Sequence, residues 1–225
     1  MMKGVAGRIT DWVRPHVPEA SDGILTSAGI GEGFAAAGVG TKVLIFAGFA
    51  AIVAGALAAG AVEYSTEGAE RDQQIAELTS ERAQLAAAPD AELDELTQLY
   101  VSRGLSRRLA QQVAIELTAH EALAAHAEAV HGITTASLAS PLRDALAVVT
   151  AFAAGAVLPW LALILIPGPP RAALTFVIVL LALALTGWIS AQISDVNPVR
   201  PIVRTAAIGV LSMTITYAAG YLFHP

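Results

Sequence analysis

The sequence lacks cysteine altogether and has few charged residues. Charged side chains make up 14% of the 225 residues and hydrophobic ones 55%, and the mean hydropathy is +0.61. Soluble domains typically carry about 25% charged residues, so this composition excludes an ordinary soluble protein and indicates that apolar surface is buried in lipid. The missing cysteines fit a reducing compartment.

The motifs of several enzyme classes are also missing. The chain contains no glycine-rich phosphate loop, no nucleophile elbow and no metalloprotease helix motif, so we expect neither an enzyme nor an ATP-driven pump, and no cofactor. Its net charge of -6 argues against a nucleic-acid partner, because phosphates would be repelled. Residues 1–20 contain Pro15 and Pro18 and no apolar core, which argues against a cleavable signal peptide.

Five stretches are long and apolar enough to be predicted as membrane spans. A bilayer core of about 30 Å requires roughly 20 apolar residues in a helix. The stretches cover residues 23–40, 43–62, 145–167, 172–193 and 202–223. The predicted fold class is therefore an all-α membrane protein with five transmembrane helices, of which residues 21–62 supply the first two and residues 145–225 the last three.

One long polar interval, residues 63–144, separates the second span from the third. It holds fourteen of the nineteen carboxylates and six arginines. Breaks at Pro89 and Gly104 divide it into three predicted helices, of which the first continues out of the second span, the second is capped by Asp90 and the third by Ser106. We expect an acidic three-helix domain.

Basic residues predict the orientation in the membrane. Three precede the first span, six lie in the 63–144 interval, and Arg200 and Arg204 lie between the fourth and fifth spans, whereas only Lys42 and Arg171 fall on the other side. This distribution places the N-terminus and the interval in the cytoplasm and the C-terminus outside. No organelle signal is visible, so we expect a bacterial plasma membrane.

Carboxylates inside or at the ends of spans are the first candidates for function, because an ionisable residue in lipid must be paired, hydrated or liganded. Asp22 opens the first span, where it is either a helix cap or a ligand, and Glu32 lies in the middle of that span. Glu63 and Glu67 close the second span, so Glu63 should lie near Asp22. Their oxygens suit divalent cations and can carry protons.

The polar interval adds ligands of a second kind. Glu92 and Glu95 are three residues apart and share a predicted helix face, and His126, Glu128 and His131 follow on the third helix. Imidazole combined with carboxylate favours iron, manganese, zinc, cobalt or nickel over calcium or magnesium. A solvated helix with a few chance histidines would have the same pattern, and the sequence leaves that alternative open.

Several short motifs, taken in chain order, resemble one known family, the vacuolar iron transporters. They are Ser21-Asp22-Gly23-Ile24-Leu25-Thr26, Glu63-Tyr64-Ser65, Glu92-Leu93-Asp94-Glu95-Leu96 after Pro89, and Gly104-Leu105-Ser106. The resemblance covers the chain from Ser21 onward. It implies a homodimer of five-helix subunits that moves ferrous iron, and often manganese, out of the cytoplasm in exchange for protons, with a three-helix cytoplasmic domain that collects the metal.

The resemblance also implies roles for single residues. Asp22 matches the family's transport aspartate, and Glu92 and Glu95 match its middle pair of cytoplasmic glutamates. Glu81 matches the first member of an earlier pair, whose second member is Gln84 here.

The chain departs from the family pattern at four further positions. The last glutamate pair falls at Ala127 and Val130, a methionine of the second span is Ala59, and Glu32 replaces a small apolar residue. We expect the neighbouring histidines to replace the lost glutamates and Glu32 to add a carboxylate to the path.

Two functions are consistent with these features. The leading prediction is a secondary transporter of Fe²⁺ or Mn²⁺, with Zn²⁺ and Co²⁺ as further possible cargoes. The alternative is a membrane anchor that transports nothing and uses its acidic helices to sense metal or to bind a partner protein.

Overall fold

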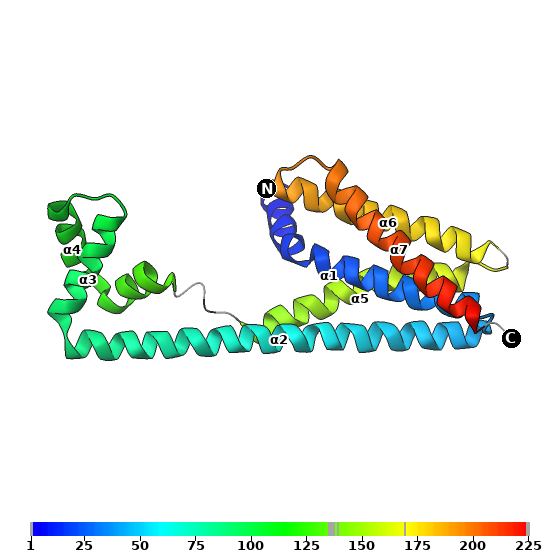
Figure 1. Ribbon diagram of the computed structural model, residues 1–225, viewed down its shortest axis with the longest axis horizontal. Helices are drawn as coiled ribbons and strands as arrows, with labels where there is room; N and C mark the ends of the chain where they lie inside the picture. Colours follow the sequence, from blue (N-terminus) through cyan, green and yellow to red (C-terminus); the bar gives the residue numbers. More distant parts are fainter. Residues whose placement is uncertain (1, 135–137, 139, 169, 224–225) are drawn as a thin grey trace. The chain divides into compact units, whose positions relative to one another are not determined.

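The computed structural model describes residues 2–134, 138, 140–168 and 170–223, and side chains from residue 15 onward. Within these residues every regular element is a helix, as predicted. The chain divides into two compact units, which Figure 1 displays and which are described separately. Unit 1 comprises Met1–Glu63 and Arg143–Pro225, and unit 2 comprises Tyr64–Leu142, nearly the same residues as the predicted 63–144 domain.

Unit 1 is a bundle of apolar helices. Its members are α1 (Met2–Ala36), the first part of α2 (Thr41–Ala87), α5 (Pro141–Leu165), α6 (Arg171–Ser194) and α7 (Val199–Leu222). Helix α1 packs against α6 and α7, which also pack against each other. Their shared core contains Ile24, Ala28, Val179, Leu183 and Met213.

Glycines allow the backbones of this bundle to approach closely. A Cβ atom on Gly23 of α1 would collide with the carbonyl of Phe152 in α5, and one on Gly155 of α5 would collide with the carbonyl of Ala20. Where two helices lie in lipid, packing of this kind replaces the hydrophobic effect as the force between them. The small residues of the first span therefore serve tight helix packing.

Helix α5 also packs against α2. The contact is a buried cluster of Ile52 and Ala56 from α2 with Phe152 and Ala156 from α5. One turn further along α5, the indole Nε1 of Trp160 donates a hydrogen bond of 3.0 Å to the backbone carbonyl of Ile45. This bond holds α5 along the first part of α2.

Four of the described helices, α2, α5, α6 and α7, are long and apolar enough to cross a membrane. Helix α1 is not among them, because Asp22, Glu32 and several glycines dilute its apolar residues. It also differs from the predicted span over residues 23–40, since it ends at Ala36, before Gly38 adopts a φ of 72°. The fifth span therefore remains a prediction.

Unit 2 consists of the rest of α2 together with α3 (Pro89–Ser102), α4 (Arg107–His126) and a π-helical turn, η1 (Ala127–His131). Leu96, Ala114 and Ala129 form its core. The predicted cap Ser106 is confirmed, because its hydroxyl accepts a 3.4 Å hydrogen bond from the backbone N–H of Leu109. The predicted cap Asp90 is wrong.

Asp90 lies inside the first turn of α3 instead. The helix begins at Pro89, whose ring presets the helical φ, and the preceding Ala88 is the N-cap without a side-chain hydrogen bond. Asp90 still stabilises the start of the helix, because a negative charge in the first turn faces the positive end of the helix dipole.

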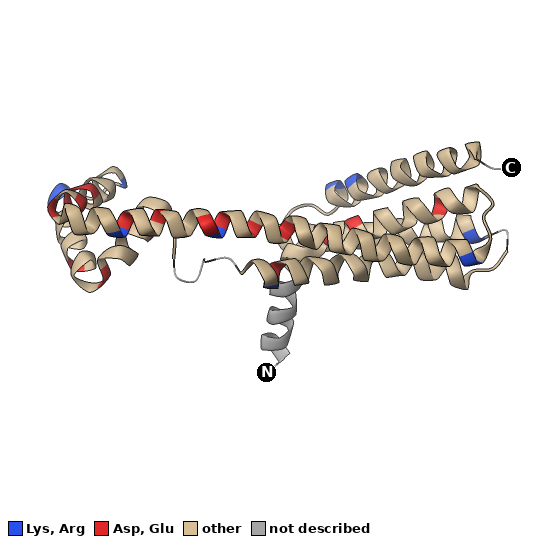
Figure 2. Ribbon diagram, turned by 90° about the horizontal axis from the view of Figure 1, so that it is seen from below, with Lys and Arg blue, Asp and Glu red and all other residues tan. Residues whose placement is uncertain are grey.

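Charge separates the two units. In Figure 2, the ribbon of unit 2 carries most of the positions coloured red for Asp and Glu, while the ribbon of unit 1 is mostly tan, the colour of residues other than Lys, Arg, Asp and Glu. Three basic residues that contribute to the predicted orientation, Lys3, Arg8 and Arg14, have side chains outside the described part of the chain. The acidic character expected for residues 63–144 thus belongs to a separately packed unit.

Candidate metal centre

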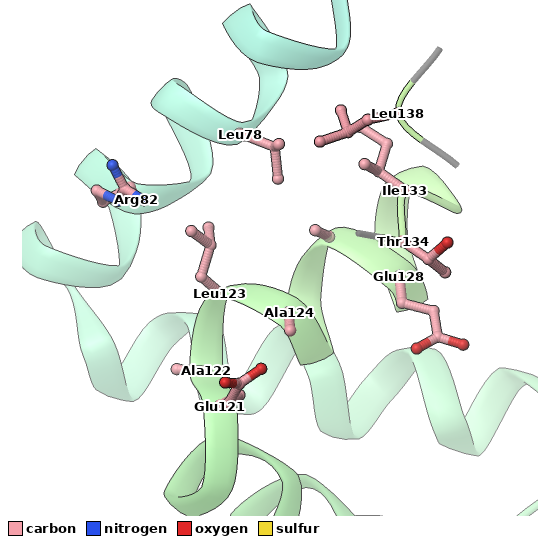
Figure 3. A pocket seen from close by; sticks show the side chains of 11 residues that line it. Leu78, Arg82, Glu121, Ala122, Leu123, Ala124, Glu128, Ile133, Thr134 and Leu138 are labelled. Atoms are coloured by element: carbon pink, nitrogen blue, oxygen red, sulfur yellow. The ribbon is translucent and has the colours of Figure 1, made fainter. Parts of the chain in front are cut away.

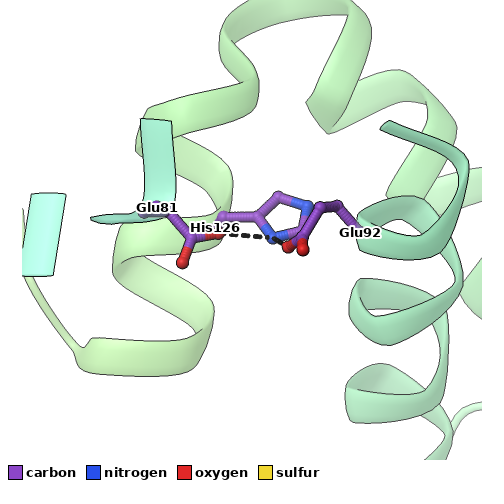
Figure 4. A group of neighbouring side chains, drawn as sticks. All are labelled: Glu81, Glu92 and His126. Atoms are coloured by element: carbon purple, nitrogen blue, oxygen red, sulfur yellow. Dashed lines mark ion pairs between the residues drawn. The ribbon is translucent and has the colours of Figure 1, made fainter. Parts of the chain in front are cut away.

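Three buried side chains from three helices converge in unit 2. Glu81 of α2, Glu92 of α3 and His126 at the end of α4 point toward one another (Figure 4), and one ligand atom of each lies within 4.8 Å of the others. Nδ1 of His126 is 3.0 Å from Oε1 of Glu81 and 3.6 Å from Oε2 of Glu92. The exposed fractions are 4% for Glu81, 8% for Glu92 and 0% for His126.

Polar atoms in this triad have no hydrogen-bond partner. Both ring nitrogens of His126 and Oε1 of Glu81 are buried without one, although Nδ1 and Oε1 are only 3.0 Å apart. An orphaned polar group in a protein interior costs free energy. Two ligands about 2.1 Å from a metal ion lie roughly 3 Å apart, so a cation would satisfy Nδ1 of His126 and Oε1 of Glu81 in the arrangement that they already have.

The charges of the triad lead to the same conclusion. Burial raises the pKa of Glu92, the neighbouring carboxylates Glu81 and Glu95 raise it further, and only His126 opposes them. The protein thus holds like charges together in a poorly solvated place, where they repel each other unless a proton or cation intervenes. One imidazole and two carboxylates suit Fe²⁺, Mn²⁺, Zn²⁺ or Co²⁺.

The end of α4 is built irregularly to place His126. Glu121 has non-helical angles (φ -152°, ψ 84°), which kink the helix, and η1 follows directly after His126. Gly132 closes the π turn with a φ of 70°, a conformation that glycine adopts without strain. Single π turns inside helices are frequent at functional sites.

The guanidinium of Arg103 in the α3–α4 connection holds the η1 turn in place by donating a 2.7 Å hydrogen bond to the backbone carbonyl of Ala129.

A second histidine lies beside the triad. Nε2 of His131 is 3.3 Å from Oε2 of Glu81, and Nδ1 of the same ring is 3.9 Å from Oε2 of Glu77. His131 and Glu77 are about 30% exposed, in contrast to Glu81. The Glu81 carboxylate therefore faces one histidine with each of its oxygens.

Other predicted ligands of unit 2 lie elsewhere. Glu95 is exposed and outside the triad, although it lies close enough to Glu92 to raise the pKa of that carboxyl. Binding of one cation by Glu92 and Glu95 together stays a prediction. Glu128 is exposed and lines a different cavity of about 560 Å³. Figure 3 shows this cavity, which the side chains of Leu78, Leu123 and other apolar residues surround.

The carboxylates of unit 1 occupy two separate places. Asp22 and Glu63 line one pocket of about 420 Å³, together with Glu19 and Thr26, as expected for two antiparallel helices. Glu67, further along α2, belongs to unit 2, where it is half-buried.

Glu32 does not line the pocket of Asp22. It is 2% exposed, its Oε1 has no hydrogen-bond partner, and it lines a cavity of about 450 Å³ with Phe176 of α6 and with Met213 and Tyr217 of α7. None of the residues that line this cavity comes from α2, and a role of Glu32 in the translocation path stays a prediction.

The sequence analysis missed Glu77. Its signal was present, because Glu77 precedes Glu81 by four residues and so lies on the same face of α2. The spacing alone would not have separated Glu77 from the other glutamates of this helix.

Comparisons with known proteins find sequence similarity over nearly the whole chain. A sequence model of the VIT family matches residues 13–221. A vacuolar iron transporter of Acanthamoeba castellanii is 34% identical over 221 residues, which cover 97% of this chain and 80% of that protein. Vacuolar iron transporter 1 of Tulipa gesneriana is 28% identical over 93% of this chain and 86% of its own length. Vacuolar iron transporter 1 of Arabidopsis thaliana is 24% identical over 91% and 83%.

Proposed function

Because the chain belongs to the VIT family, we propose that it is a secondary transporter that exports ferrous iron, manganese or both from the cytoplasm in exchange for protons. The relatives are named as iron transporters. The observation that carries the proposal within this chain is the buried group of Glu81, Glu92 and His126, whose orphaned atoms suit a divalent cation.

In this proposal unit 2 captures the ion and unit 1 conducts it. Unit 2 lies in the cytoplasm, where its triad takes metal at low concentration. The ion then moves to the pocket of Asp22 and Glu63, which offers carboxylate oxygens at the ends of two closely packed helices. Oxygen ligands alone hold Fe²⁺ and Mn²⁺ more loosely than mixed oxygen and nitrogen ligands, which favours onward release.

Proton exchange follows from the same carboxylates. A group that is either metal-bound or protonated, but not both, couples the movement of the two cations in opposite directions. Asp22, Glu63 and Glu32 are the candidates for this role in unit 1. Each of them offers a carboxylate and no competing imidazole among the residues that line its pocket.

The proposal includes an arrangement in the membrane. The protein forms a homodimer in the bacterial plasma membrane, with α1 as the fifth span of each subunit, the N-terminus and unit 2 inside and the C-terminus outside. Glu67 and Glu95, whose side chains lie outside the triad, and Glu128 in its separate cavity, are assigned to the attraction of cations toward unit 2, because an acidic surface raises their local concentration.

Uptake into inverted membrane vesicles tests the proposal. We expect an imposed proton gradient to drive Fe²⁺ or Mn²⁺ into vesicles that contain the protein, with Co²⁺ and Zn²⁺ measured beside them. Asp22→Asn should abolish this uptake, because the amide keeps the size of the side chain and removes its charge. Asp195→Asn is the matched control, since Asp195 is exposed and its φ of 50° suits asparagine.

The outcomes separate transport from mere binding. Gradient-driven uptake that is lost only in Asp22→Asn supports the antiporter. A folded protein that binds metal and moves none would instead identify a membrane-anchored sensor or scaffold.

A further inference from the structure

The cavity of Glu32 in unit 1 combines one buried carboxylate with apolar and aromatic walls. It has a volume of about 450 Å³, and its lining includes Glu32 of α1, Phe176 of α6, and Met213 and Tyr217 of α7. We propose that this cavity binds a protonated organic amine, with the ammonium group at Glu32 and the apolar part of the molecule between α6 and α7. The site is separate from the pocket of Asp22 and goes beyond the proposed transport of metal.

The carboxylate of Glu32 has no partner in the protein. It is 2% exposed, and its Oε1 accepts no hydrogen bond. It forms no ion pair with any side chain that the structure describes. Arg171, at the start of α6, instead donates a 2.9 Å hydrogen bond from its Nε to the backbone carbonyl of Ile166. A lone buried carboxylate costs free energy, which a cation entering the cavity would remove.

The ligands of this cavity are too few for a transition metal. Besides Glu32, the polar side chains in its lining are those of Thr214 and Tyr217. The hydroxyl of Thr214 donates a 2.6 Å hydrogen bond to the backbone of its own helix. A Mn²⁺ ion prefers about six ligands, mostly oxygen or nitrogen atoms. One carboxylate therefore suits a cation with a single charge, which it balances alone.

The walls favour a cation that carries an apolar body. The faces of aromatic rings such as those of Phe176 and Tyr217 attract ammonium groups, and the flexible thioether of Met213 adapts to irregular ligand shapes. Pockets for small organic molecules have volumes of about 300–1,000 Å³, with mostly apolar walls and a few polar groups that fix the orientation of the ligand. The cavity of Glu32 has this composition and size.

The cavity lies near the ends of its three helices. Glu32 is four residues before the end of α1 at Ala36, or about 6 Å along the helix axis, and Ala173 near the start of α6 also lines the cavity. Ala173 and Thr214 are exposed, so the cavity opens between α6 and α7. In the proposed topology these ends face the outside. The amine is thus either a free molecule from that side or the ammonium headgroup of a membrane lipid.

Binding of phenethylamine to the purified full-length protein in detergent, measured by equilibrium dialysis, tests the site. Phenethyl alcohol is the matched ligand, because it has nearly the same shape and no charge. The wild type should bind the amine at least about tenfold more tightly than the alcohol, since a hydrogen bond between two ions is stronger than one to a neutral group. Glu32→Gln should abolish this preference. Asp195→Asn is the control, because Asp195 is exposed and outside the cavity, and should keep it.

Tyr217→Leu tests the aromatic wall without touching the carboxylate. Leucine keeps apolar bulk and removes the ring face, so affinity for the amine should fall about two- to fivefold while affinity for the alcohol stays the same. This variant also keeps the site testable if Glu32→Gln fails to fold.

A lipid arm identifies the source of the amine. In nanodiscs, adding phosphatidylethanolamine to phosphatidylglycerol should lower the apparent affinity for phenethylamine if the lipid headgroup occupies the site, and should leave it unchanged if the site takes free amines. Equal binding of amine and alcohol by the wild type, a preference that survives in Glu32→Gln, or no binding of the amine at millimolar concentration would overturn the proposal. None of these readouts involves Mn²⁺ uptake, so the amine site and the transport function can fail separately.

Discussion

Unit 2 and unit 1 both concentrate carboxylates, but they surround them differently. In unit 2, Glu81 and Glu92 are buried against an imidazole, whereas in unit 1 Asp22 is exposed and Glu63 half-buried in a pocket whose lining contains no histidine. Mixed nitrogen and oxygen ligands in a dry site bind transition metals firmly, and oxygen ligands in a wet pocket bind them weakly. Under the proposed function, this difference suits unit 2 to the capture of metal and unit 1 to its passage.

The largest effect that would sharpen this contrast is expected for Glu81→Gln. The substitution keeps the size of the side chain and removes the charge that the triad shares, so Mn²⁺ affinity at unit 2 should fall at least about 100-fold. A competition titration against a fluorescent chelator measures this fall. Glu116→Gln, an exposed position on α4, is the control and should retain wild-type affinity; an equal change in both variants would contradict the assigned site.

A smaller effect is expected in unit 1 for Glu32→Gln. If the buried carboxylate of Glu32 takes up a proton during transport, the amide should slow uptake into vesicles at least about tenfold. Size-exclusion chromatography should show unchanged assembly, and Mn²⁺ binding at unit 2 should stay intact. Unchanged uptake would show that Glu32 takes no part in transport.

The smallest expected effect is the pH dependence of stability and of Mn²⁺ affinity, and it arises from Glu92 of unit 2. The pKa of Glu92 is raised above its ordinary value near 4.5, so the metal-free folded protein holds a proton that the unfolded chain has already lost. Its free energy of unfolding therefore falls as pH rises through the raised pKa. Metal displaces the same proton, so Mn²⁺ affinity should rise with pH, by no more than about tenfold per unit, and level off above that pKa.

Titrations of Mn²⁺ at several pH values measure this slope. Glu92→Gln should reduce it, because one fewer proton is released, and Glu116→Gln should leave it as in the wild type. A slope that persists in full in Glu92→Gln would assign the titrating group to another residue.

Local signals in the sequence were enough for most helix boundaries. Pro89 and Ser106 mark real helix starts, because a fixed φ and a capping hydroxyl act within one turn of the residue that supplies them. Helix α2 also continues beyond the apolar stretch up to the predicted break. The first span was harder to predict. The glycines and carboxylates of α1 lower its mean hydropathy, so the helix does not stand out as a membrane span.

The metal centre was only partly predictable. Glu81, Glu92 and His126 were each expected as ligands, two of them with support from a family pattern. That they would meet could not be derived, because Glu81 and His126 are 45 positions apart in the chain and helix periodicity relates only near neighbours. The partner of Glu92 depends on tertiary packing around Leu96, which spacing does not encode.

The π turn at Ala127–His131 has a consequence for how such a site can arise. A π turn contains one residue more than the α-helical path that would replace it. Deletion of a single codon in this turn would therefore decide whether His126 and His131 both face the carboxylate of Glu81. Loss of that codon would rotate everything after it by about 100° without altering any ligand. The set of side chains around Glu81 would thus change between lineages through one short insertion or deletion, while each of those side chains is inherited intact.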